Sequence, residues 1–292
     1  MSTNRIFSPQ PTEDGSYTFY SQEFQEAFHS SFGAKQEAEV RYIEPCKIKQ
    51  LATKKSHIRL LDICYGLGYN SAAALEAIWS VNPECKVELI ALEISADVPR
   101  QAIKHHLLDQ WRSPVPILLS QLGNKSVIRD KYLVAELLLG DARHTIQSVV
   151  KKGWQADAIF LDPFSPRKCP QLWTVEFIGL IGKCLISTGR LATYSCSAAV
   201  RTALIVNNFQ ISSITGAGRK SPGTLAQLEY KTSHLLSQKE NEHLQTRAAI
   251  PYRDRNLNLS AKEIISKRNK EQHVSNLEST SQWRKRWLES HI

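Results

Sequence analysis

The stretch IRLLDICYGLGYN, residues 58–70, decides the fold of this chain. Its first seven residues are mostly aliphatic and predict a buried strand, and Gly66 and Gly68 predict a sharp turn after that strand. Residues 70–79, NSAAALEAIW, are rich in alanine and leucine and predict the helix that follows the turn. A strand, a glycine turn and a helix in this order indicate an open α/β sheet, which binds ligands at the carboxyl ends of its strands.

The alternation of strands and helices continues toward residue 230. Four further aliphatic runs predict strands: VELIALE at 87–93, ELLL at 136–139, ADAIFLD at 156–162 and LATYS at 191–195. Helices are predicted at 97–108 and 173–185, and two more strand-like runs lie between residues 209 and 230. Near-continuous aliphatic strands that alternate with helices are typical of a parallel sheet with both faces covered.

This pattern divides the chain into three parts. Residues 58–232 carry the alternating strands and helices and predict one α/β domain. Residues 1–57 contain many aromatics with little periodicity, and residues 233–292 form a polar, basic C-terminal extension.

Composition predicts a globular protein of the cytosol. Hydrophobic residues make up 42% of the 292 residues and charged residues 22%. No apolar run approaches the roughly 18 residues that cross a bilayer, and the N-terminus lacks the apolar core of a secretory signal. None of the six cysteines forms a CxxC pair, so we expect reduced, buried cysteines and neither a disulfide framework nor a metal site.

The charge balance favours a polyanionic partner. Lys and Arg total 37 against 28 Asp and Glu, a formal net charge of +9. A basic protein gains affinity for nucleic acid because each neutralised phosphate releases condensed counterions. Charge alone does not establish such a partner, since it also governs solubility and association.

Three strand ends carry residues that suit a nucleoside cofactor. Asp62 precedes the glycine turn, and Cys64 occupies the first glycine position of a dinucleotide fingerprint, so a ligand without a pyrophosphate, such as S-adenosylmethionine, is favoured. Glu93 ends the second strand, where it can accept hydrogen bonds from a ribose diol. Asp141, after the third strand, can accept a hydrogen bond from the exocyclic amine of adenine. Taken singly, the turn is also compatible with a purely structural role and Glu93 with a solvated surface position.

The fourth strand ends in the candidate chemical site. Asp162 is followed by Pro163 and Phe164, an acid and an aromatic that suit methyl transfer to nitrogen. The aromatic can pack against a base or a cationic amine, and the carboxylate can hold the N–H groups of the amine. A carboxylate near its reference pKa of ~3.9 is a weak base, so we assign Asp162 to orientation and electrostatics, with the proton passing to water. A turn closed by the aspartate side chain is the alternative.

These motifs resemble the MnmC-like tRNA methyltransferases, which make 5-methylaminomethyl(-2-thio)uridine at the wobble position. LDPFSPRKCPQLWT, residues 161–174, resembles the family segment LDxFxPxKNPxxWt, and LDICYGLGYNS, residues 61–71, resembles its cofactor loop. The similarity covers most of the chain and extends to YSQEFQEAFHSSFGAKQEAEVRYI (20–43), GAGRKSPGTLAQL (216–228) and IPYRD (250–254).

The resemblance implies a Rossmann-like class I methyltransferase fold, a mostly parallel twisted sheet with one antiparallel edge strand and helices on both faces. It implies S-adenosyl-L-methionine as cofactor, tRNA as partner and Asp162 as the catalytic residue. The expected cofactor-binding residues are Asp62, Tyr65, Gly66, Gly68, Asn70, Glu93, Asp141 and Ala142. Residues 1–57 are expected to close the acceptor pocket, with Phe28, His29, Glu37 and Phe164 as its walls.

The chain departs from the family pattern at two positions and in length. Cys169 stands where asparagine is usual, and Pro163 stands where glycine or alanine is common, so the acceptor pocket can differ in shape. Bifunctional relatives also carry a flavin oxidase domain, for which this chain has no room. We therefore expect it to act only on an aminomethyl group that other enzymes make.

Candidate RNA contacts are the cations near these motifs. They are Arg167, Lys168, Arg219, Lys220, Arg253 and Arg255, each of which is also compatible with an exposed charge that has no partner. A base that is modified in a pocket must first leave its stack.

Three alternatives use the same fold. An aminopropyltransferase would need an acidic acceptor pocket, which the positive charge balance disfavours. A non-catalytic RNA-binding relative is disfavoured by the intact Asp162 and glycine loop. A small-molecule amine N-methyltransferase would lack salt-sensitive RNA binding.

Overall fold

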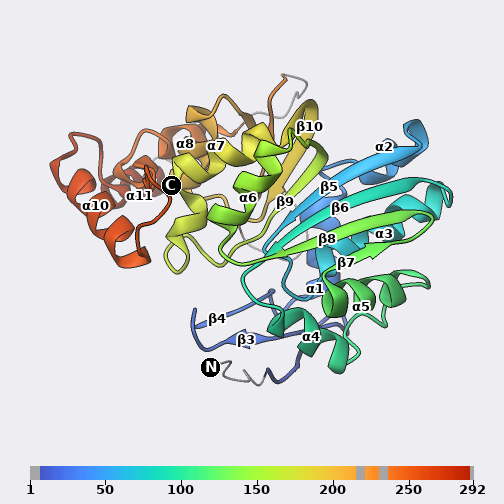
Figure 1. The fold of residues 1–292 in the computed structure, drawn as a ribbon. Helices are drawn as coiled ribbons and strands as arrows, with labels where there is room; N and C mark the ends of the chain where they lie inside the picture. Colours follow the sequence, from blue (N-terminus) through green and yellow to red (C-terminus); the bar gives the residue numbers. More distant parts are fainter. Residues whose placement is uncertain (1–6, 215–220, 230–235, 290–292) are drawn as a thin grey trace.

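The computed structural model describes residues 7–214, 221–229 and 236–289, and its centre is a sheet of eight strands (Figure 1). The strand order is β11-β12-β10-β9-β5-β6-β8-β7. Five parallel strands form the middle of the sheet: β5 (His57–Ile63), β6 (Lys86–Glu93), β8 (Leu133–Leu139), β9 (Ala156–Leu161) and β10 (Leu185–Thr193). The mostly parallel, Rossmann-like sheet expected from the sequence is thus confirmed.

Antiparallel strands complete the sheet on both sides. β12 (Gly223–Gln227) runs antiparallel to β10 and to the edge strand β11 (Gln210–Ile214). At the other edge, the short β7 (Val127–Arg129) pairs antiparallel with β8. On the β10 side, the edge strand is β11, and the antiparallel strand β12 lies between β11 and β10.

Helices cover both faces of the sheet, and the strand residues alternate between two cores. Leu60 of β5 belongs to the core that contains α3 (Tyr69–Val81), α4 (Asp97–Lys104) and α5 (Val115–Lys125). Its neighbour Leu61 belongs to the core that contains α6 (Ala142–Lys151), α7 (Val175–Lys183) and α8 (Ala198–Val206). Successive side chains of a strand point to opposite faces, so each helix layer packs on its own set of strand residues.

The N-terminal segment folds into short hairpins and helices. Its elements are β1 (Gln10–Pro11), β2 (Tyr17–Thr18), β3 (Tyr20–Ser21), β4 (Glu26–Ala27), α1 (Ala34–Ala38), a π-helical turn (Glu39–Ile43) and α2 (Ile48–Lys54). Strands β3 and β4 lie below the sheet in Figure 1.

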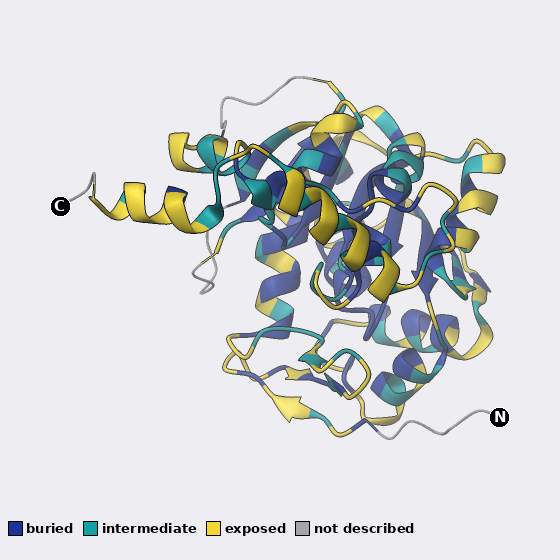
Figure 2. Ribbon diagram, turned by 90° about the vertical axis from the view of Figure 1, so that its left-hand side faces the viewer, coloured by how far each residue is buried: buried dark blue, intermediate teal, exposed yellow. Residues whose placement is uncertain are grey.

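The C-terminal segment packs on the α7 side of the sheet. It contains α9 (Gln238–His243), a 3-10 turn (Arg247–Ala249), α10 (Ala261–Val274) and α11 (Thr280–Glu289). Tyr252 and Ile264 are buried in the same core as α6 and α7, whereas α11 is exposed along most of its length (Figure 2). Within the described ranges, none of the helices is long and apolar enough to cross a membrane.

All six cysteines lie in the described ranges as free thiols; four are buried, and Cys64 and Cys196 are partly exposed.

Candidate active site

The carboxyl ends of the parallel strands open into one pocket of about 810 Å³. β5 and β9 are neighbours in the sheet, and the chain leaves them toward opposite faces, into α3 and toward α7 respectively. A crevice at such a point is where open α/β sheets bind ligands. Residues from the N-terminal hairpin β3–β4 cover the other side of the pocket.

The glycine turn after β5 is held by the acid at the end of β6. The backbone N–H of Gly66 donates to Glu93 Oε2 at 2.8 Å, and the N–H of Ile94 donates to Glu93 Oε1 at 2.8 Å. Gly66 and Glu93 both line the pocket. Burial raises the pKa of Glu93, although the backbone hydrogen bonds oppose the shift. A ligand in the pocket would therefore meet the backbone of the glycine turn and the carboxylate of Glu93 side by side.

Gly68 is required by the backbone of this turn and by the side chain of Tyr65 that packs against it. Its φ is +85°, and a Cβ at this position would lie 2.5 Å from the hydroxyl oxygen of Tyr65. Only glycine combines this backbone angle with the available space. Cys64, in the first glycine position of the turn, also has a left-handed φ of 69° and lines the pocket as a protonated thiol, because burial raises its pKa.

Four of the expected cofactor residues do not line the pocket. Asp62 is completely buried and accepts a hydrogen bond from Ser71 Oγ at 2.6 Å, so it joins β5 to α3. Tyr65 packs beneath Gly68, and Asn70 donates from Nδ2 to Asp162 Oδ2 at 2.9 Å. These residues, with Gly68, support the turn instead of facing the pocket.

Burial of Asp62 predicts a dependence of stability on pH. Loss of solvation is the largest cause that raises its pKa to about 7 from 3.8, and the charge of Asp162 adds to it. Between these values the folded chain keeps a proton that the unfolded chain has released, so the free energy of unfolding falls as the pH rises from about 4 to 7. Asp62→Asn has no such proton, and we expect its stability relative to wild type to increase by a few kcal/mol over that range. Thermal melting of both proteins without cofactor measures the difference, and a constant difference between pH 4 and 7 would contradict the assignment.

Asp141, after β8, lines the pocket and is held by an arginine that the sequence did not single out. Arg143 donates from Nη2 to Asp141 Oδ2 at 2.7 Å and from Nη1 to Asp254 Oδ2 at 2.8 Å. Burial by itself would raise the pKa of Asp141, but the hydrogen bonds and charge of Arg143 outweigh it and lower that pKa. Asp254 is fully buried, so this chain of charges ties the C-terminal segment to the pocket. Ala142, the next residue after Asp141, also lines the pocket.

Asp162 faces the pocket from the end of β9. Besides Asn70, its neighbours include Tyr42, whose pKa is raised by burial and then by the charges of Asp162 and Glu37, so the phenol stays protonated. The loop that follows is fixed by Tyr194, which donates from its hydroxyl to the carbonyl oxygen of Pro163 at 2.9 Å. The carboxylate is thus held in a defined orientation.

Aromatic side chains form one wall of the pocket. Phe164 stacks on Phe24 with ring centroids 4.3 Å apart, and Phe28 meets Phe164 edge-on at 5.0 Å. Glu26 of β4 accepts hydrogen bonds from the backbone N–H of Ser165, at 2.9 Å, and from its hydroxyl. The N-terminal hairpin is therefore attached to the loop after Asp162.

Of two other N-terminal residues expected at the pocket, Glu37 lies there and His29 does not. Glu37 lines it and accepts the N–H of Ser30 at 3.0 Å. His29 does not line the pocket; it stacks on Tyr69 of α3, with centroids 5.1 Å apart.

The pocket is acidic. Among its described lining residues, one side chain is basic, Arg143, and the acidic ones are Glu23, Glu26, Glu37, Glu93, Asp97, Asp141 and Asp162. A positive net charge of the whole chain therefore says little about the pocket, and it does not disfavour an aminopropyltransferase. An acidic lining suits a sulfonium and a cationic amine, since both are attracted by nearby carboxylates.

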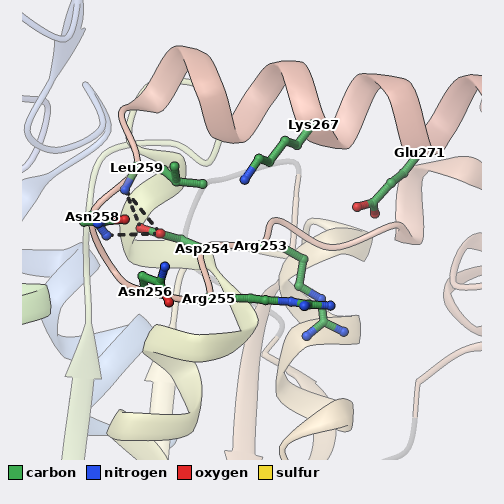
Figure 3. A pocket seen from close by; sticks show the side chains of 8 residues that line it. All are labelled: Arg253, Asp254, Arg255, Asn256, Asn258, Leu259, Lys267 and Glu271. Atoms are coloured by element: carbon green, nitrogen blue, oxygen red, sulfur yellow. Dashed lines mark hydrogen bonds between the residues drawn. The ribbon is translucent and has the colours of Figure 1, made fainter.

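Four of the expected RNA-contacting cations are described by the structure, and they lie outside this pocket. Arg167 and Lys168 are exposed on the loop after Phe164, and Arg253 and Arg255 line a separate pocket in the C-terminal segment (Figure 3). Arg219 and Lys220 lie outside the described residues. The described ranges contain no group of three or more His, Cys, Asp or Glu side chains that could hold a metal ion.

Comparison with known proteins agrees with this fold. Residues 99–229 match a family model described as S-adenosyl-L-methionine-dependent methyltransferase. An uncharacterized protein of Methanocaldococcus jannaschii, MJ0670, is 33% identical over 269 residues, which cover 88% of this chain and 70% of that protein. The crystal structure of MnmC2 from Aquifex aeolicus superimposes with a TM-score of 0.81 at 32% identity and covers 92% of this chain and 85% of that one.

Longer relatives match over part of their length. The tRNA 5-methylaminomethyl-2-thiouridine biosynthesis bifunctional protein MnmC of Acidovorax sp. (strain JS42) is 25% identical over 218 residues, 71% of this chain and 33% of that protein. This chain thus spans about a third of the length of the bifunctional proteins that it matches. From the matched family model, and from the identity and coverage of the Aquifex aeolicus structure, the chain belongs to the MnmC-like family of S-adenosyl-L-methionine-dependent methyltransferases.

Proposed function

We propose that this enzyme N-methylates the 5-aminomethyl group of wobble (2-thio)uridine in tRNA, giving 5-methylaminomethyl-(2-thio)uridine. The observation that carries the proposal is the position of Asp162, which lies beside the aromatic wall in a pocket lined with carboxylates. The names of the bifunctional relatives support the same substrate, since they refer to biosynthesis of tRNA 5-methylaminomethyl-2-thiouridine.

The pocket fits S-adenosylmethionine at the ends of β5, β6 and β8. A Cβ at Gly66 would project into the space between the turn and Phe28, and its nearest contact would be a Phe28 ring carbon at 3.5 Å. We assign Gly66 to the close approach of the cofactor, Glu93 to the ribose hydroxyls, and Asp141 with Ala142 to the adenine. When bound, the cofactor supplies an electrophilic methyl group on a sulfonium.

Asp162 has the central role in the proposed transfer. Its carboxylate would accept N–H bonds from the acceptor amine in its neutral form and stabilise the positive charge that develops on the nitrogen as the N–C bond forms and the bond from sulfur to the methyl group breaks. Asn70 holds the carboxylate in position, and Phe164 contacts the uracil ring. Alignment of the amine with the methyl group can contribute roughly 7–11 kcal/mol, so little acid–base chemistry is required from the chain. The proton leaves the product amine for water.

The acidic lining also favours one alternative, an aminopropyltransferase, because polyamine acceptors are cations. The two activities differ in both substrates. Incubation with S-adenosylmethionine and tRNA that carries 5-aminomethyluridine tests the first, and incubation with decarboxylated S-adenosylmethionine and a polyamine tests the second. Product formation only in the second reaction would replace our proposal.

Nucleoside analysis of tRNA is the direct test in cells. In cells that lack this protein we expect loss of the methylaminomethyl nucleoside and accumulation of its aminomethyl precursor. Return of the wild-type gene should restore the product, whereas a gene encoding Asp162→Ala should not. An unchanged nucleoside profile in the deletion strain would exclude this substrate. A tRNA substrate would be consistent with the cytoplasmic location expected from the sequence.

A further inference from the structure

A second pocket lies between the loop 253–259 and helix α10, and basic side chains surround it. Arg253 and Arg255 extend from the loop in the same direction, and Lys267 extends from α10 toward the loop (Figure 3). All three side chains belong to exposed residues, and Glu271 is the acid at the rim of the pocket. None of these residues belongs to the pocket that contains Asp162.

The loop is a fixed platform, because Asp254 is buried at its centre. The backbone N–H groups of Asn258 and Leu259 donate to Asp254 Oδ1 at 3.1 and 3.2 Å. Arg143 neutralises the carboxylate from the other side at 2.8 Å. With Asp254 turned inward, the residues on both sides of it, Arg253 and Arg255, are turned outward. A fixed backbone reduces the entropy that the loop loses when its two arginines bind a ligand.

The positive charge of this pocket is partly compensated, since Glu271 lines it and Glu263 lies within electrostatic reach of Lys267. Arg253 has one ion pair, to Glu176 at 3.3 Å, and both groups reach solvent. Arg255 and Lys267 form no ion pair with any residue in the part of the chain that the structure describes. The charge of Asp254 is already matched by Arg143, so it does not offset the three outward cations.

The pocket adjoins the methyl-transfer site. Arg143 contacts Asp141 at one end of its guanidinium and Asp254 at the other, so one side chain separates the two pockets. Tyr252 precedes the loop, and its carbonyl oxygen accepts the N–H of Val175 at 3.1 Å. The guanidinium of Arg268 lies over the ring of Tyr252, 4.6 Å from its centroid, so a further cation lies beside the start of the loop.

We propose that Arg253, Arg255 and Lys267 bind a backbone phosphate of the RNA substrate, close to the nucleotide that enters the methyl-transfer site. This inference rests on the proposed tRNA substrate and adds the site that would hold its backbone. Guanidinium groups match phosphate oxygens with paired N–H donors, and a lysine adds a point charge. An acidic protein segment would be attracted by the same charges, and the experiment below separates the two.

The test measures binding of an unmodified tRNA transcript to Arg253→Ala/Arg255→Ala/Lys267→Ala between 50 and 200 mM salt. We expect Kd at low salt to rise at least about tenfold and the log–log salt slope to fall by roughly 0.7–0.9 for each phosphate that the variant no longer neutralises. Affinity for S-adenosylhomocysteine should stay within about twofold, because no substituted residue lines the main pocket. Arg255→Gln/Lys267→Gln, which retains the Arg253–Glu176 pair, should show a smaller change in the same direction.

Lys49→Ala/Lys54→Ala/Lys86→Ala is the matched control. It removes the same charge from exposed lysines near the amino-terminal end of the sheet, away from both pockets, and should bind tRNA almost as wild type does. If wild type methylates tRNA and both triple variants bind it equally well, the phosphate site is wrong while the proposed function stands. If wild type neither binds nor methylates tRNA, the proposed function fails. If poly-glutamate competes as well as RNA for the pocket, an acidic protein is the ligand and the phosphate assignment is overturned.

Discussion

Replacing Asp162 by alanine should slow methyl transfer by about 10²–10³-fold, the usual effect of removing one group that stabilises transition-state charge. The carboxylate lies at the end of β9 with Asn70 on one oxygen and faces the pocket, where we propose that it contacts the acceptor amine. Affinity for S-adenosylhomocysteine should remain within a few-fold of wild type. Single-turnover rates with tRNA and calorimetry with S-adenosylhomocysteine separate the two effects.

Asp162→Asn is the control for charge. The carboxamide has nearly the same shape and can still accept the hydrogen bond from Asn70, but it carries no negative charge. We expect most of the rate to be lost in this variant too, because the charge that develops on the nitrogen is then unopposed. Wild-type rates in the asparagine variant would show that hydrogen bonding alone suffices, and wild-type rates in the alanine variant would remove Asp162 from the mechanism.

Gly66→Val should weaken S-adenosylhomocysteine binding by at least about 100-fold. Gly66 has a φ of +55°, which a β-branched residue adopts only with strain, and it lines the pocket where the cofactor should approach the backbone. The valine would also disturb the hydrogen bond from the Gly66 N–H to Glu93, the acid assigned to the ribose. Calorimetry on the folded variant measures the loss.

Gly153→Val is the matched control for backbone strain. Gly153 follows α6 with a φ of +63°, and a Cβ there meets nothing within 4 Å. This variant should lose stability to a similar extent and keep its affinity for S-adenosylhomocysteine. Equal affinities in the two variants would mean that the cofactor does not approach Gly66.

The parallel strands can be predicted mainly because β5, β6 and β9 are buried on both faces over most of their length and are therefore largely aliphatic. Four of the five parallel strands were expected within about three residues of their observed bounds, whereas β10 begins at Leu185, six residues before the start predicted at Leu191. The sequence does not reveal α5, since Pro114 and Pro116 interrupt its apolar run near the start of the helix. Nor does it reveal β7, whose three residues are too few to establish an alternating pattern.

The site is predictable where chain position alone places a residue at a strand end. Glu93, Asp141 and Asp162 line the pocket because parallel strands bring their carboxyl ends to one edge. Arg143 and its partner Asp254 are 111 residues apart, and no local pattern pairs them. For the same reason, the net charge of +9 does not predict the charge of the pocket. Its acidic side chains come from distant segments of the chain, whereas most basic side chains lie elsewhere.

The inward position of Asp254 couples the proposed RNA site to the proposed adenine site through Arg143. The loop that would hold RNA and the carboxylate that would hold adenine share one buried arginine, Arg143. If occupation of the loop alters the position of Arg143, RNA will change the affinity for S-adenosylmethionine by some factor. Thermodynamic reciprocity then requires the cofactor to change the affinity for RNA by the same factor. Binding one ligand at saturating levels of the other would therefore report how rigidly the C-terminal segment and the cofactor site are joined.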